Sequence, residues 1–181
     1  MKRAALTVAV GMLMLWAAVG PAAAQNGTAS DASGDAPARI DVTSLHVENG
    51  NRWFTMKVDV RDLRQKGVFN FFYERGRREA GDRPHRGSLI IVHRVAGETR
   101  ARYLGCSSED CSAEPGERCR RLRATWNSAE DFIRISAPQA CIWWLRRNPD
   151  RSPPRTGTFE VYATLGDSAD DGTDLLVVDR G

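Results

Sequence analysis

Residues 40–60 constrain the fold of this chain more than any other stretch. Apolar side chains alternate there with more polar ones, a period of two that is typical of a β-strand with one buried and one solvated face. The pair Asn49-Gly50 precedes the alternating run and tolerates the positive φ that a tight hairpin turn requires. The stretch therefore predicts an antiparallel hairpin that packs against the rest of the protein on one side. Its inward residues are Phe54, Met56, Val58 and Val60, and its outward residues are Trp53, Thr55, Lys57 and Asp59.

Further short apolar or alternating runs follow, separated by turn-forming residues. No window of twelve residues after the first 24 shows the 3.6-residue apolar period of a helix. We therefore expect an all-β protein, an antiparallel β-sandwich of about eight or nine short strands. Beyond the first hairpin, the predicted strands cover residues 68–73, 88–95, 100–104, 122–126, 132–135, 158–165 and 175–178. The predicted core contains Phe54, Met56, Val58, Val60, Phe69, Phe71, Ile90, Val92, Ile133, Ile135, Phe159 and Val161.

The first 24 residues have the three parts of a secretory signal peptide. Lys2 and Arg3 precede an uncharged apolar stretch, and small residues ending at Ala24 form a cleavage signal. An uncleaved membrane anchor is the alternative, but the apolar run is shorter than the ~20 residues that a spanning helix needs. Residues 25–38 are rich in Ser, Gly, Asp and Ala and predict a flexible tether, and residues 39–181 are predicted to form one domain. We expect a secreted protein, extracellular or on the outside of the cell envelope, with no membrane attachment after cleavage.

Four cysteines in an exported chain predict two disulfide bonds. Cys106 and Cys111 enclose a short loop that can close on itself, which leaves Cys119 to pair with Cys141. A four-cysteine zinc site is the alternative, but no Cys-x-x-Cys pair is present and export favours oxidation. We expect the disulfides to brace the sandwich, and we predict neither a metal nor a cofactor.

The charge balance argues against a nucleic-acid partner. Removing Lys2 and Arg3 from the 26 basic residues leaves 24 against 23 acidic residues, a net charge of +1. Nucleic-acid-binding domains are normally markedly basic. We expect a monomer that binds an extracellular protein or a cell-wall polysaccharide.

The sequence shows no reactive set of side chains. The histidines His46, His85 and His93 lack metal-binding spacing, no Gly-x-Ser-x-Gly elbow is present, and every cysteine has a structural use. A carboxylate pair for glycoside hydrolysis stays open, because the fold sets the separation of such a pair. The acidic residues on predicted strands, which we interpret as marking a solvated face, are Asp41, Asp59, Glu74 and Glu160.

Two groups of aspartates lie near the ends of the predicted domain. Oxygen-rich clusters suit Ca²⁺, but the alternating spacing of an EF-hand loop is missing. We therefore interpret both groups as solvated turn residues rather than metal ligands. The first group is Asp31, Asp35 and Asp41, and the second is Asp167, Asp170, Asp171 and Asp174.

Two loops combine arginine with aromatic or proline residues. Five arginines lie in the loop 75–87, and Trp143-Trp144 begin a Pro- and Arg-rich segment that ends at Arg155. Such residues carry interface energy when a partner desolvates them. Trp53, on the predicted solvated face of its strand, is a further aromatic that can stack on a sugar or contact a partner. The predicted binding residues in the two loops are Trp143, Trp144, Arg75, Arg77, Arg78 and Arg83.

The layout of residues 35–63, together with the runs 124–126, 131–135 and 137–141, resembles a group of small exported sandwich proteins from GC-rich bacteria that have no assigned activity. The run Gly34-Asp35 followed by Ile40-Asp41-Val42 resembles the start of the ninth family of carbohydrate-binding modules and of the related DOMON sandwiches. The first resemblance implies a fold and export. The second resemblance does not extend to the residues that bind haem or sugar in those families, because this chain has no recognisable counterpart of them. Neither resemblance therefore assigns a role to a residue.

The sequence therefore predicts a secreted, non-catalytic binding or interaction module rather than an enzyme. A secreted hydrolase whose carboxylates are assembled by the fold is the first alternative. A secreted protease inhibitor is the second, because the disulfide-braced loop 105–119 can present a rigid segment to a protease.

Overall fold

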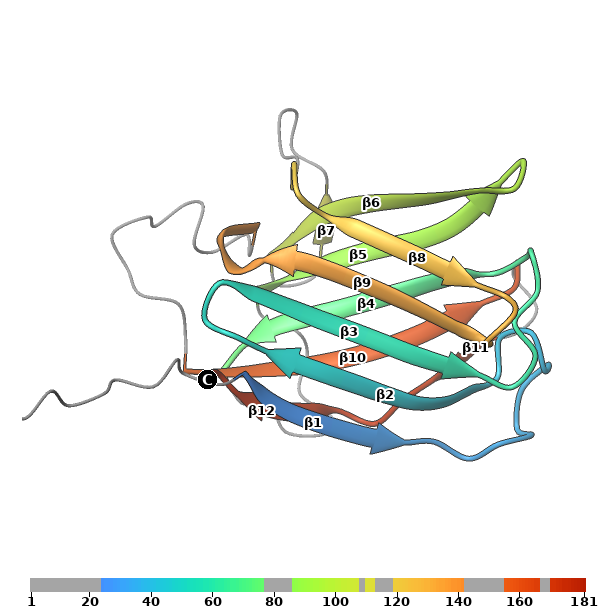
Figure 1. The fold of residues 1–181 in the computed structure, drawn as a ribbon, viewed down its shortest axis with the longest axis horizontal. Coiled ribbons are helices and arrows are strands. Elements are labelled where there is room, and N and C mark those ends of the chain that lie inside the picture. The colour runs from blue at the N-terminus through green and yellow to red at the C-terminus, as the bar shows by residue number, and fades with distance from the viewer. Residues whose placement is uncertain (1–23, 77–85, 108–109, 113–118, 142–154, 167–169) are drawn as a thin grey trace, which may run out of the picture.

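The computed structural model describes residues 24–76, 86–107, 110–112, 119–141, 155–166 and 170–181. Two antiparallel sheets pack face to face in these residues (Figure 1), which confirms the predicted β-sandwich. Apart from strands, the described residues contain one 3₁₀ turn, Gln139–Cys141, and no α-helix. None of the described segments is a helix that could cross a membrane.

Each sheet is assembled from strands that lie far apart in the sequence. The five-stranded sheet has the order β1 (Gln25–Ser30), β2 (Val42–Asn49), β3 (Trp53–Val60), β9 (Phe132–Pro138), β8 (Arg123–Asn127). The seven-stranded sheet has the order β11 (Asp170–Gly172), β10 (Thr156–Thr164), β4 (Val68–Arg75), β5 (Arg86–Val95), β6 (Glu98–Ser107), β7 (Asp110–Ser112), and β12 (Leu176–Asp179) also pairs with β10.

The predicted first hairpin is confirmed as β2 and β3, but the predicted turn is wrong. Asn49 is the last residue of β2, neither Asn49 nor Gly50 has a positive φ, and the connection falls at residues 50–52. The Gly50 N–H donates to the carbonyl of Trp53 across the turn, and Asn49 pairs with Phe54 in the register of the two strands. The alternation predicted for β3 is also confirmed, because its even-numbered residues are buried and its odd-numbered residues are partly exposed. This alternation gives the five-stranded sheet one face for the core and one face for solvent.

Aromatic rings from the two sheets contact each other across the core. The Phe54 ring on β3 stacks on the Tyr73 ring on β4 with centroids 5.2 Å apart, and Phe69 on β4 meets the edge of Trp126 on β8 at 5.3 Å. Burying such large rings from both faces is the main stabilising contribution in a sandwich. All twelve predicted core residues are confirmed as buried: Phe54, Met56, Val58, Val60, Phe69, Phe71, Ile90, Val92, Ile133, Ile135, Phe159 and Val161.

Both predicted disulfides are confirmed, and no free cysteine is present. Cys106 and Cys111 face each other in the register of β6 and β7. Cys119 and Cys141 join the segment before β8 to the 3₁₀ turn after β9, so they close off the β8–β9 hairpin.

The prediction of a flexible tether at residues 25–38 is wrong at its start. Residues 25–30 form β1, which pairs with all but the first two residues of β2. Small residues allow this: a Cβ added at Gly27 would come within 2.6 Å of the Val178 side chain on β12, so glycine lets the edge strand lie close to the other sheet. A low-hydrophobicity segment can therefore be ordered by backbone pairing to an existing strand edge.

Two further expectations need correction. The described residues contain twelve strands rather than eight or nine, because β1 and the three-residue strands β7 and β11 lack an alternating apolar pattern.

Asp41 and Glu74 are not on a solvated face: Asp41 is fully buried, and Glu74 is 5% exposed. Asp41 is held by the Arg61 guanidinium at 3.0 Å and by the Gly34 N–H at 2.8 Å, so its charge is compensated inside the fold.

Candidate functional site

The outer face of the five-stranded sheet carries a groove of about 360 Å³. Its lining comes from four neighbouring strands, β2, β3, β9 and β8, which lie side by side in Figure 1. All of the lining side chains are polar or charged. They are His46, Glu48, Thr55, Lys57, Arg123, Thr125, Arg134 and Ser136, and we call this site the outer groove.

Strand register arranges these eight side chains as two adjacent rows that run across the sheet. The first row is His46, Lys57, Arg134 and Thr125, and the second row is Glu48, Thr55, Ser136 and Arg123. Every one of them is an outward position of its strand, because the residues between them point into the core. The core alternation therefore forces these polar side chains together on the opposite face.

Positive charge is concentrated in the first row. Lys57 lies directly opposite Arg134, and like charges in that position repel each other. Lys57 is partly compensated, since its Nζ lies 2.5 Å from Asp59 Oδ1 and 5.0 Å from the centroid of the Phe132 ring. In contrast, the Arg134 and Arg123 guanidinium groups have no hydrogen-bond or ion-pair partner within the described part of the chain.

A polar network borders the groove at the β2–β3 pair. Asp59 Oδ2 accepts a hydrogen bond from the Ser44 hydroxyl at 2.8 Å and lies 3.0 Å from His46 Nε2. Burial alone would raise the pKa of Asp59, but hydrogen bonds from Lys57 and Ser44 and the charges of Lys57 and His46 outweigh burial and lower it. Asp59 is therefore a carboxylate that orders this side of the groove.

Trp53 extends the groove toward the hairpin turn. A second hollow, of about 390 Å³, is lined by Trp53 with the turn residues Gly50, Asn51 and Arg52, and it shares Glu48 and Thr55 with the outer groove. Trp53 is partly exposed, as predicted for an outward position on β3. The sheet face thus carries a half-buried indole next to hydroxyl and charged side chains.

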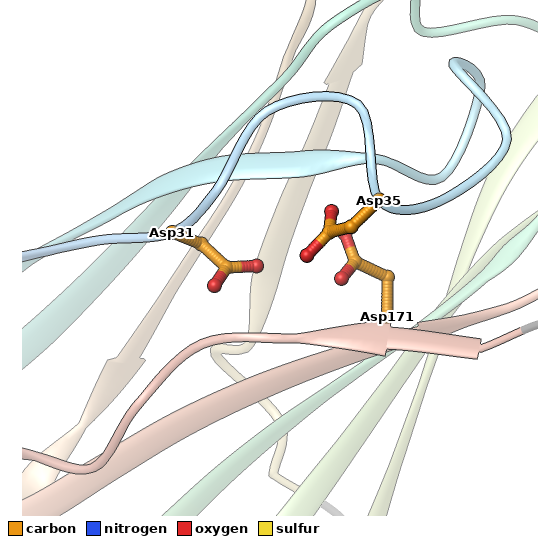
Figure 2. Close-up of side chains that lie close together, drawn as sticks. All are labelled: Asp31, Asp35 and Asp171. Atoms are coloured by element: carbon orange, nitrogen blue, oxygen red, sulfur yellow. The ribbon is translucent and has the colours of Figure 1, made fainter.

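Three carboxylates meet at another place, beside the loop between β1 and β2. Figure 2 shows Asp31, Asp35 and Asp171 pointing toward one another, and one oxygen from each lies within 4.8 Å of the others. Asp171 comes from β11 and accepts a hydrogen bond from the Val42 N–H, 129 residues away in the sequence. Burial raises the pKa of Asp171, and the charges of Asp31 and Asp35 raise it further, so the three carboxylates repel each other.

This acidic cluster brings together members of the two aspartate groups singled out in the sequence. No other His, Cys, Asp or Glu among the described residues joins it. Ca²⁺ takes six to eight oxygens, and three carboxylates offering one oxygen each supply half of these or fewer. We therefore treat the cluster as a source of electrostatic strain and assign it no metal.

Replacing Asp35 by asparagine is expected to raise the free energy of unfolding at pH 7 by about 0.5 kcal/mol, the scale of exposed charge pairs. The pKa of Asp171 is higher in the folded protein than in the unfolded chain. Asp171 therefore stabilises the fold at pH values below its unfolded-state pKa, and this stabilisation is lost as the pH rises through its folded-state pKa. The gain from Asp35→Asn should therefore become smaller toward pH 3, where Asp171 is protonated, and should also become smaller in ~1 M salt.

Urea unfolding in a buffer containing a chelator measures this effect. Glu130→Gln is the matched control, because Glu130 is an exposed carboxylate at the β8–β9 turn, outside the cluster. A loss of stability in Asp35→Asn at pH 7 would contradict repulsion within the cluster.

The binding residues predicted from sequence cannot be compared with this geometry. Trp143, Trp144, Arg77, Arg78 and Arg83 lie outside the described residues, and of Arg75 the structure describes the backbone at the end of β4. Those assignments stay predictions. The outer groove was missed because its side chains look like ordinary outward positions of four separate strands. The clue available in the sequence was that the cation Lys57 shares one face of its strand with Trp53, with Thr55 between them.

The strand carboxylates of the hydrolase alternative lie in three separate places. Asp41 is buried with Arg61, whereas Asp59 lies at the outer groove with Lys57, so these two do not face each other across a cleft. Glu74 pairs with Thr158 and Glu160 with Phe72, which makes the two glutamates diagonal neighbours on the face of the seven-stranded sheet that points away from the core, where Glu74 is nevertheless buried. The hydrolase alternative therefore depends on Glu74 and Glu160, and it stays a prediction.

Comparison with known proteins adds no assignment. No protein-family model, curated protein or solved structure matches this chain. The resemblances drawn from short runs of the sequence accordingly stay predictions, and a function must be argued from the site itself.

Proposed function

We propose that this protein is a secreted, non-catalytic binding module whose contact surface is the outer groove. The observation that carries the proposal is the row arrangement of eight polar side chains from four strands, with two arginines that have no partner in the described part of the chain. A rigid sheet holds these groups in place, and preorganised polar groups favour binding because little ordering is required.

The chemistry of the groove supports binding over catalysis. Its lining contains one carboxylate, Glu48, whereas glycoside hydrolysis uses a pair of carboxyl groups. The hydroxyl groups of Thr55, Thr125 and Ser136 and the cationic side chains are hydrogen-bonding groups suited to a polar ligand. The groove also crosses the strands along both rows, so it suits a chain-like ligand that contacts several side chains in succession.

Export of the protein is part of the same proposal. Two disulfides in a chain of this size are typical of oxidising compartments outside the cytosol. They support the signal-peptide interpretation of residues 1–24, most of which lie outside the described residues. N-terminal sequencing of the exported protein tests this part, and we expect Gln25 as the first residue.

The groove is tested by filling it. Ser136 lies in the second row, partly buried, and Ser136→Leu adds bulk there and removes a hydroxyl that accepts from Thr55 at 3.3 Å. Thr164→Leu is the matched control, because Thr164 is a partly buried hydroxyl residue at the end of β10 in the other sheet. Affinity electrophoresis against neutral and acidic soluble polysaccharides, and pull-down of extracellular proteins, provide the readout.

We expect at least one probe to bind the wild-type protein and the Thr164→Leu control, and to bind Ser136→Leu at least about tenfold more weakly, a loss of roughly 1.4 kcal/mol. Thermal unfolding verifies that both variants are folded. If every probe that binds the wild type also binds folded Ser136→Leu equally well, the outer groove is not the contact surface.

A further inference from the structure

The outer groove holds positive charge that the rest of the described fold leaves uncompensated. Three cationic side chains, Lys57, Arg123 and Arg134, and one carboxylate, Glu48, lie among its eight lining residues. Lys57 has Asp59 as a partner, but the two arginines have none among the described residues. Holding Arg134 directly opposite Lys57 is unfavourable in the free protein, and an anion bound between them would relieve that repulsion.

The two arginines are placed so that they can act together. Arg123 pairs with Ser136 and Thr125 pairs with Arg134, so the arginines are diagonal neighbours on the same face of adjacent strands. Guanidinium groups bind carboxylates through two parallel hydrogen bonds, a geometry that the rigid sheet can offer twice along the groove. The site therefore suits a ligand with repeated carboxylates rather than a single small anion.

The hydroxyl and indole groups beside the arginines indicate what the ligand offers besides carboxylates. Thr55, Ser136 and Thr125 offer hydroxyl groups beside the arginines, and Trp53 presents an indole at the turn end of the same face. Hydroxyl groups match the hydroxyls of sugars, and an aromatic face can stack on a sugar ring. Sugar rings carrying carboxylates would use all three kinds of group.

Two other kinds of polymer fit this surface less well. Three cations and two carboxylates, Glu48 in the groove and Asp59 beside it, give this face a small net charge, whereas nucleic-acid-binding domains are normally markedly basic. A protein partner usually buries an apolar patch at the centre of its interface, whereas the outer groove is lined only by polar and charged residues and Trp53 lies at its end.

We propose that the outer groove binds an acidic polysaccharide that carries carboxylates on its sugars, with Arg123 and Arg134 contacting the carboxylates and Trp53 stacking on a ring. This inference rests on the proposed function and specifies its ligand class. Alginate and polygalacturonate serve as probes, and dextran serves as the neutral probe of similar polymer character.

Three variants of the mature exported protein separate the contributions of the groove arginines and of Glu48 to binding. Arg123→Ala/Arg134→Ala removes the unpaired cations, and Arg100→Ala/Arg102→Ala removes two exposed arginines from β6 in the other sheet as the matched control. Glu48→Gln removes the carboxylate from the groove while keeping its size. Binding is measured by affinity electrophoresis and by titration calorimetry at about 0.05 M and about 0.5 M salt.

We expect the acidic probes to bind the wild type more tightly than dextran, and the groove double variant to bind them at least about tenfold more weakly, because each arginine makes charge-assisted hydrogen bonds. The β6 control should bind as the wild type. Glu48→Gln should bind acidic probes more tightly and dextran unchanged, a gain that a purely structural role of this residue would not produce. Raising the salt concentration should weaken binding of the acidic probes.

Other outcomes overturn the proposal. If dextran binds as well as the acidic probes, if a single-stranded oligonucleotide binds more tightly than both of them, or if the folded groove double variant binds like the wild type, the ligand class is wrong. In those cases a loss of binding in Ser136→Leu would still support the groove as the contact surface. If neither Ser136→Leu nor the groove double variant loses any ligand, the proposed function fails together with this inference.

Discussion

Replacing Phe54 by alanine is expected to lower the free energy of unfolding by about 3–5 kcal/mol, the range for removing a buried phenylalanine ring. Phe54 is 2% exposed and lies where the two sheets meet, stacked on Tyr73 at 5.2 Å and packed against Phe159 at 6.4 Å. Its removal leaves a cavity that two β-sheets cannot close, because each backbone is fixed by pairing on both sides. The midpoint of thermal unfolding should fall by roughly 10 °C or more.

Equilibrium urea unfolding measures this effect, and the neighbouring residue provides its control. Thr55 is partly exposed on the opposite face of the same strand, so Thr55→Ala should change the free energy of unfolding by about 0.5 kcal/mol or less. A loss below about 1 kcal/mol in Phe54→Ala would mean that the two sheets do not pack through this ring.

Removing the disulfide between Cys119 and Cys141 is the second change with a large expected effect. The bond joins residues 22 positions apart and closes off the β8–β9 hairpin, which carries half of the outer groove. Cross-linking a loop of this length restricts the unfolded chain by about 3 kcal/mol in the chain-entropy description. Cys119→Ala/Cys141→Ala should therefore unfold at a clearly lower urea concentration than the wild type.

The second disulfide supplies a comparison inside the same molecule. Cys106 and Cys111 are 5 positions apart, so their bond should contribute less, about 2 kcal/mol by the same relation. Intact mass with and without reductant verifies which bond each variant retains. If Cys106→Ala/Cys111→Ala is the less stable of the two variants, loop length does not control what these bonds contribute.

Much of the fold could be predicted because its signals are local. The alternation from Phe54 to Val60 and the Asn-Gly pair beside it act within a few residues. They predicted the hairpin, its buried face and the fold class, although the turn itself falls at residues 50–52. The disulfide pairing followed from the short Cys106–Cys111 loop in the same way. Strand β1 was missed because its residues show no apolar period. It forms a strand because its backbone pairs with the edge of β2.

The candidate site could not be predicted, because it depends on which strands become neighbours. Lys57 and Arg134 face each other across β3 and β9, although 77 residues separate them in the sequence, and the acidic cluster joins Asp31 to Asp171 across nearly the whole chain. The sequence by itself determined which side chains of each strand point outward, since alternation is a property of one strand. The tertiary structure alone decided that outward cations from β3, β9 and β8 lie together, because the order and register of strands are set by long-range pairing and core packing.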